Sequence, residues 1–149
     1  PSLRLAASAD AEAVRAVVTA AYEPWIPVIG MRPGPLEEDY DRLIAAGRVT
    51  VLEPSDGAGV AALIVLAPEP DVLLIENVAV DPAYQGRGLG RLLLAHAEDV
   101  ARATHLGAVR LYTHRLMASN IALYQRLGYV VTGSGDNHGR PVVHLAKTL

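Results

Sequence analysis

The stretch from Leu73 to Arg91, LLIENVAVDPAYQGRGLGR, constrains this chain more than any other. Valine, isoleucine and leucine dominate residues 73–80, which is typical of a strand that is covered on both faces. Asp81-Pro82 ends that strand, because proline fixes φ and cannot donate to a ladder. Glycines follow at positions 86, 88 and 90, and an apolar helical pattern begins directly after them. A glycine-rich turn at a helix N-terminus presents unpaired N–H groups and a positive dipole end, so this stretch predicts a phosphate site beside an open strand.

The composition narrows the class of protein. With 149 residues, of which 51% are hydrophobic and 19% charged, we expect one domain over residues 1–149. The formal charge of -3, with no long run of either sign, argues against nucleic acid or an anionic membrane as partner. The chain has no cysteine, which excludes disulfides, thiolate metal ligands and a cysteine nucleophile, and no metal site is expected. No signal segment and no apolar run of about 18 residues is present, so we expect a cytoplasmic protein outside the membrane.

The pattern of apolar residues and turn signals predicts the order of elements. We expect strands over residues 3–6, 48–53, 60–67, 73–80, 109–113, 129–132 and 141–147, the last two around a polar loop at 133–140. Helices are expected over residues 8–22 with Ser8 as N-cap, over 36–46 with Glu37, Glu38 and Asp39 in the first turn, over 88–105, and to residue 127 from a cap at Ser119 or Asn120. Residues 23–35 should form a structured loop. This order indicates one mixed α/β domain, a single sheet with helices on both faces.

Three kinds of phosphate loop compete for the glycine stretch. A Walker A loop requires Lys and then Ser or Thr after its last glycine, whereas Arg91 and Leu92 follow Gly90, so that interpretation fails. A dinucleotide fingerprint requires G-x-G-x-x-G and an acidic residue about 20 positions later, and neither is present. The third pattern, [QR]-x-x-G-x-[GA], fits Gln85-Gly86-Arg87-Gly88-Leu89-Gly90.

This third pattern resembles the pyrophosphate loop of the GNAT superfamily of acyl-CoA-dependent N-acetyltransferases. The stretch from Asn120 to Tyr129, NIALYQRLGY, is similar to the second motif of that family, N-x-x-x-Y-x-x-x-G-[FY]. The expected element order matches the family's fold from end to end. The resemblance implies a mostly antiparallel central sheet of about six to seven strands in a single domain, with acetyl-CoA as co-substrate.

The resemblance also implies which residues hold the CoA. Residues 86–91 would wrap its pyrophosphate with backbone N–H groups, and the strand before them would splay from its neighbour and pair with the pantetheine amides. An N–H near Val78 would hold the thioester oxygen as negative charge develops. Asn120 is either an N-cap or a further CoA contact, and Arg87 and Arg91 are either phosphate ligands or solvated surface residues. The implied cofactor-binding residues are Val78, Ala79, Val80, Gln85, Gly86, Arg87, Gly88, Leu89, Gly90, Arg91, Asn120 and Tyr124.

Two proton transfers accompany direct attack of an amine on the acetyl thioester. By spacing alone Tyr124 is a core residue, but its position in the motif implies that it donates a proton to the leaving thiolate, since a tyrosine with a pKa near ~10 stays protonated at neutral pH. Glu76 is the one charge inside LLIENVAV and is either a salt-bridged structural residue or the base for the substrate amine. His114 is a rival base.

The acceptor pocket is expected in the loops at 22–36 and 133–140, where the family builds it. Its candidate lining residues are Tyr22, Trp25, Ile29, Met31, Arg32 and His114, although Trp25 and Ile29 equally suit a role in sealing the core. The acceptor is expected to be a primary amine on a small molecule or peptide, and the protein a monomer or homodimer. The alternative is a CoA-binding regulatory module on the same fold that transfers no acetyl group.

Overall fold

The computed structural model describes residues 2–57 and 59–149. Seven strands form a mixed sheet in the order β1-β2-β3-β4-β5-β7-β6, which confirms the expected fold class. The chain separates into two compact units. The first unit comprises the residues up to Leu66 together with Asn77–Leu93, and the second comprises Ala67–Glu76 together with Leu94–Leu149.

The first unit is built on an antiparallel ladder. Strand β1 (Ser2–Leu5) pairs with β2 (Val49–Glu53) from Ser2↔Glu53 to Leu5↔Thr50, and β2 pairs with β3 (Ala62–Pro68) from Val49↔Val65 to Leu52↔Ala62. At the end of β4 (Leu73–Val80), the Asp81 N–H donates to the Ala61 carbonyl at 2.9 Å. Strands β2 and β3 are buried along almost their whole length, which explains their continuous apolar sequence.

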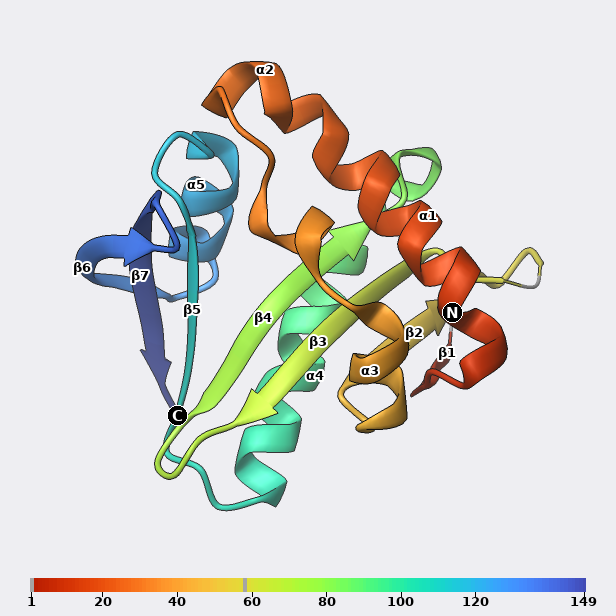
Figure 1. Ribbon diagram of the computed structural model, residues 1–149. Helices are drawn as coiled ribbons and strands as arrows, with labels where there is room; N and C mark the ends of the chain where they lie inside the picture. The colour runs from red at the N-terminus through yellow and green to blue at the C-terminus, as the bar shows by residue number, and fades with distance from the viewer. Residues whose placement is uncertain (1, 58) are drawn as a thin grey trace. The chain divides into compact units, whose positions relative to one another are not determined.

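Short helices surround this ladder in the first unit. Helix α1 (Ala11–Tyr22) presents Val14, Val17 and Val18 to the core at the expected helical spacing, and α3 (Tyr40–Ala45) lies beside it (Figure 1). Between them lie η2 (Glu23–Trp25), α2 (Ile26–Ile29) and η3 (Gly34–Glu37), all of one to two turns. Three of the four prolines of residues 23–35 therefore sit in the first turn of a short helix, where proline is tolerated, and the fourth, Pro33, directly precedes η3.

The second unit combines a parallel and two antiparallel strand pairs. The first half of β4 pairs in parallel with β5 (Ala108–His114), from Leu73↔Val109 to Ile75↔Leu111. Strand β7 (Arg140–Thr148) pairs antiparallel with both β5 and β6 (Val130–Asn137). Helix α4 (Leu89–Ala103) buries Leu94, Ala97 and Ala101, and α5 (Ala118–Arg126) follows β5.

Four predicted boundaries are wrong. Ser8 lies inside a 3-10 turn, η1 (Ser8–Asp10), and the N-cap of α1 is Asp10. The helix expected over 36–46 begins only at Tyr40, where Asp39 accepts from the Arg42 N–H at 3.2 Å. Neither Ser119 nor Asn120 caps α5, because that helix begins at Ala118 after Met117. The polar loop expected at 133–140 is mostly strand, and only residues 138–139 connect β6 to β7.

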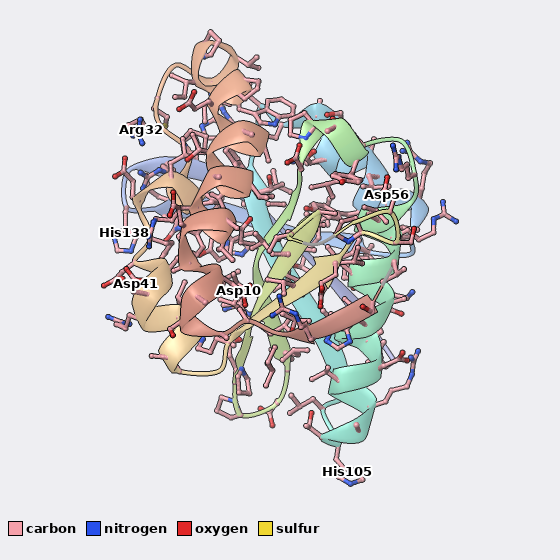
Figure 2. All side chains as sticks on the ribbon, turned by 90° about the vertical axis from the view of Figure 1, so that its right-hand side faces the viewer. Asp10, Arg32, Asp41, Asp56, His105 and His138 are labelled. Atoms are coloured by element: carbon pink, nitrogen blue, oxygen red, sulfur yellow. The ribbon has the colours of Figure 1, made fainter. Side chains whose placement is uncertain are left out.

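Asp10 joins the start of α1 to the edge strand through ion pairs (Figure 2). Its carboxylate accepts from Arg4 Nη1 at 2.7 Å and Nη2 at 2.9 Å, and from the Ala7 N–H at 2.7 Å. Arg4 also donates through Nε to Glu53 at 2.6 Å. The hydrogen bonds from Arg4, and then the one from Ala7, lower the pKa of Asp10 to about 2.

This shift gives an expected acid dependence of stability. Because the folded pKa lies below the unfolded value of about 4, Asp10 stabilises the fold above about pH 4, and this contribution is lost as pH falls through about 2. Urea denaturation measures the free energy of unfolding at each pH. Between pH 5 and about 2 this free energy should decline less steeply in Asp10→Asn and in Arg4→Met than in the wild type. A wild-type slope in Asp10→Asn would contradict this role.

Candidate active site

The predicted phosphate loop joins the end of β4 to the start of α4 in the first unit. Asp81 accepts from the Ala83 N–H at 2.9 Å and caps the 3-10 turn η4 (Pro82–Tyr84). The Gln85 side chain then donates to the Val80 carbonyl at 3.3 Å and holds the loop against the strand end. Gly86 and Gly88 have φ of 80° and 78°, in the left-handed region that favours glycine.

The loop leaves hydrogen-bond donors and space for an anion. The Leu92 N–H donates to the Gly88 carbonyl at 3.1 Å, so the three N–H groups of residues 89–91 have no acceptor within the helix. A Cβ added at Gly86, Gly88 or Gly90 would meet nothing within 4 Å. The backbone conformation therefore favours glycine at positions 86 and 88, and all three glycines leave the backbone accessible. Free donors, open space and the positive helix end together fit a pyrophosphate.

Arg87 flanks this loop as an exposed cation. Its guanidinium lies 4.0 Å from the Asp56 carboxylate (labelled in Figure 2) and 5.0 Å from the centre of the Tyr84 ring. Both members of the ion pair are more than half exposed, so the pair is screened by water and weak. A phosphate at the loop can therefore attract Arg87 away from Asp56 at small cost.

A buried hydrogen-bond chain, absent from the sequence-based prediction, lies just before this loop. The Tyr22 hydroxyl lies 2.6 Å from Asn77 Oδ1 and 2.9 Å from the Val78 carbonyl. Asn77 Nδ2 donates to the Tyr40 hydroxyl at 3.0 Å, and that hydroxyl donates to the Pro35 carbonyl at 2.7 Å. Tyr22, Tyr40 and Asn77 are at most 9% exposed. These hydrogen bonds thus connect the middle of β4 to α1 and to the start of α3.

These four contacts have only three protons to share. Each tyrosine hydroxyl supplies one proton, the amide of Asn77 supplies a donor on one side only, and the two carbonyls supply none. If the Asn77 amide is flipped, its nitrogen donates to the Tyr22 hydroxyl, and the Tyr40 proton is then shared between Asn77 Oδ1 and the Pro35 carbonyl. The four contacts still have only three protons. In the orientation described, the Tyr22 proton is shared between Asn77 Oδ1 and the Val78 carbonyl. The Val78 carbonyl is therefore one of two acceptors for this proton.

We expect Tyr40→Phe to lower the free energy of unfolding by about 1–3 kcal/mol, because it leaves the Asn77 amide and the Pro35 carbonyl without this hydroxyl. Urea denaturation measures the change. Tyr84→Phe, in which the ring still packs against Arg87, should stay within about 0.5 kcal/mol of the wild type. Equal stability of the two variants would show that the Tyr40 hydroxyl contributes nothing.

The candidate acceptor residues of the first unit differ in burial. Tyr22 and Ile29 are buried, whereas Trp25 and Met31 are half-buried. Arg32 is exposed (Figure 2) and donates through Nε to Glu37 at 2.7 Å. Tyr22 belongs to the hydrogen-bond chain, and Ile29 to the core, so these two are positioned as structural groups. Trp25, Met31 and Arg32 keep surface exposed to solvent.

Tyr124 lies on α5 in the second unit. Its carbonyl accepts from the N–H groups of Leu127 and Tyr129, each at 3.0 Å, and its ring meets that of Tyr129 edge-on at 6.3 Å. Burial raises the pKa of Tyr124 to about 12. Among the residues that the structure describes, its hydroxyl makes no hydrogen bond. The phenol thus keeps its proton throughout the neutral range and has that proton available to donate.

His114 and Glu76 are the two candidate bases, and both belong to the second unit. His114 is buried, and its Nδ1 accepts from the Leu116 N–H at 3.1 Å, so in the neutral ring the proton lies on Nε2. Burial, and then the charges of Arg115 and Arg140, lower the pKa of His114. Its one acceptor nitrogen is therefore already used by the backbone. Glu76 is half-buried in β4 and stays a candidate base.

The described residues contain no group of three or more His, Cys, Asp or Glu side chains that would hold a metal ion. In the same part of the chain, no helix has the length and apolar character required to cross a bilayer. Asn120 is half-buried in the first turn of α5, where its N–H donates to the Met117 carbonyl at 3.1 Å.

Comparisons with known proteins identify this arrangement. The model of the acetyltransferase (GNAT) family matches residues 14–129. The chain is 36% identical over 91 residues to a mycothiol acetyltransferase of Beutenbergia cavernae, covering 61% of this chain and 31% of that one. It is 41% identical over 59 residues to the ribosomal protein bS18 alanine N-acetyltransferase of Salmonella typhimurium, covering 40% of each. The chain therefore spans about a third of the length of the first relative and two fifths of the second.

The fold has a close match among solved structures. It superposes on the PaiA N-acetyltransferase of Thermoplasma acidophilum, solved with coenzyme A, with a TM-score of 0.81 at 16% identity, over 99% of this chain and 98% of that one. The chain thus has the same fold as that protein. With the family model matching most of its length, the chain belongs to the acetyltransferase (GNAT) family.

Proposed function

We propose that this protein transfers an acetyl group from acetyl-CoA to a primary amine by direct attack in a ternary complex. The observation that carries the proposal is the glycine loop. In it, two left-handed glycines and three N–H groups without an acceptor in their own helix lie at the start of a helix of 15 residues. That loop accounts for the pyrophosphate. Membership of the family accounts for the acetyl group.

The backbone of residues 78–80 would hold the acyl arm. Pantetheine amides need both donors and acceptors, and the Val78 carbonyl has a second lone pair with which it would accept from one of them. A backbone N–H near Val78 would stabilise the thioester oxygen as it gains charge.

Two side chains would carry out the proton transfers, one as a base and one as an acid. The substrate amine loses a proton to Glu76, directly or through water, and its nitrogen forms a bond to the acetyl carbon. The carbon–sulfur bond then breaks, and Tyr124 donates its proton to the departing sulfur. Because the chain has no cysteine, no cysteinyl acyl-enzyme takes part. The two relatives are named for mycothiol and for an alanine of a ribosomal protein, which are different acceptors. The acceptor of this chain is therefore proposed only as a primary amine.

Thermal unfolding with acetyl-CoA, CoA and NAD tests the cofactor. A ligand at about 100 times its Kd should add about 2.7 kcal/mol to stability, which raises Tm visibly. We expect acetyl-CoA and CoA to raise Tm and NAD to leave it unchanged. No shift with acetyl-CoA would refute the proposal. A regulatory module on the same fold would show the same shift, and turnover with amines distinguishes it.

A further inference from the structure

A partly buried ion pair lies beneath the end of α5 in the second unit. Lys147 of β7 donates through Nζ to Glu98 of α4 at 3.0 Å, and the two side chains are 29% and 12% exposed. The same ammonium donates to the Leu127 carbonyl at 3.0 Å. Lys147 therefore places a positive charge at the C-terminal end of α5, where the helix dipole is negative.

Gly128 permits this close approach. It follows α5 with φ of 95°, and a Cβ there would lie 3.3 Å from Cε of Lys147. The ammonium also lies 5.8 Å from the centre of the Tyr129 ring. The turn after α5 is thus shaped around the lysine side chain.

Tyr129 connects the ion pair to Tyr124. Its hydroxyl donates to Glu98 at 3.3 Å, its N–H donates to the Tyr124 carbonyl at 3.0 Å, and its ring packs edge-on against the Tyr124 ring. Burial, and then the charge of Glu98, raise the pKa of Tyr129, so this hydroxyl remains a donor. One continuous path of contacts leads from Lys147 and Glu98 to the ring of Tyr124.

We propose that Lys147 and Glu98 are positioning residues that hold the Tyr124 hydroxyl in place for proton donation. The inference rests on the proposed acid role of Tyr124. Stability alone does not explain the pair, because replacing a buried ion pair by apolar groups is often neutral or stabilising. The pair instead fixes the turn after α5 from two other elements, α4 and β7, and a displacement of about 1 Å at a reacting group can cost about 100-fold in rate.

The test measures kcat and the KM for acetyl-CoA in Lys147→Met, which keeps the apolar stem and removes the ammonium. We expect kcat to fall by about 10- to 100-fold with KM changed less than about twofold. In the Tyr124→Phe background the same substitution should lower kcat no further, because residues that act as a unit are not additive. The matched control is Arg110→Met, which breaks the bidentate Arg110–Glu69 ion pair (2.7 and 2.8 Å) in the same unit. This variant should keep the wild-type kcat.

A double variant distinguishes an effect on the placement of Tyr124 from an effect on the stability of the protein. Lys147→Met with Glu98→Gln removes both charges but keeps an amide oxygen as acceptor for the Tyr129 hydroxyl. Much of the Tm lost in Lys147→Met should therefore return while kcat stays low. Recovery of kcat together with Tm would overturn the inference. So would a wild-type kcat in Lys147→Met, or an equal further loss in the Tyr124→Phe background. If Tyr124→Phe itself keeps full kcat, the acid role fails first, and this inference fails with it.

Discussion

Replacing Tyr124 by phenylalanine is expected to lower kcat by about 10- to 10⁴-fold, the range for loss of a general acid. The affinity for acetyl-CoA should stay within about twofold, because the ring and its edge-on contact with Tyr129 are retained. Only the proton is lost, and the thiolate must then leave without one. Steady-state kinetics with a thiol-detecting assay gives kcat, and calorimetric titration gives Kd.

The pH dependence provides the control for this assignment. Burial raises the pKa of Tyr124 to about 12, so the acid form persists through the whole working range and is lost only as pH approaches that value. Wild-type kcat should therefore show no decline attributable to loss of this proton up to about pH 10, the value at which an ordinary tyrosine titrates. An unchanged kcat in Tyr124→Phe would make Tyr124 a structural residue.

Gly88→Val is expected to abolish binding of acetyl-CoA. Gly88 has φ of 78°, which a β-branched residue adopts only with strain, and its Cβ would fill the open space at the start of α4. Because nothing in the protein lies within 4 Å of that Cβ, the loss would come from the ligand's site and the loop conformation. Acetyl-CoA should then no longer raise Tm.

Gly47→Val is the matched control for backbone strain. Gly47 follows α3 with φ of 71°, and its added Cβ also meets nothing within 4 Å. Both variants should lose stability to a similar extent, but only Gly88→Val should lose the response to acetyl-CoA. A normal response in Gly88→Val would refute the placement of pyrophosphate at this loop.

The sequence was most informative where structure is set by neighbouring residues. Asp81-Pro82 ends β4, and the glycines lead into α4, as predicted, because proline and left-handed glycine act locally. The second part of strand β6, residues 133–137, was missed for the opposite reason. Its residues are polar and exposed, and what makes residues 133–137 a strand is their pairing with β7, to which no local pattern points.

The hydrogen-bond chain and the ion pair could not be predicted in full for the same reason. Asn77 was visible as a polar residue in an apolar run, and Glu98 follows Leu94 on the buried face of α4 by one turn. Their partners are far away in sequence: Tyr22 is 55 residues from Asn77, and Lys147 is 49 residues from Glu98. Only the fold shows which hydrogen-bond partners Asn77 and Glu98 have, and which backbone segments these contacts hold together.

The most direct test of acetyl transfer is to measure free thiol and acetylated product together, with acetyl-CoA and a panel of primary amines. The panel should include amino sugars, aminoglycoside-like compounds, polyamines and peptides with a free N-terminus. We expect at least one amine to give thiol and amide in equal amounts, with Tyr124→Phe slower on that same amine. Acetyl-CoA that raises Tm but is turned over with none of these amines would contradict the account and favour a CoA-binding regulatory module.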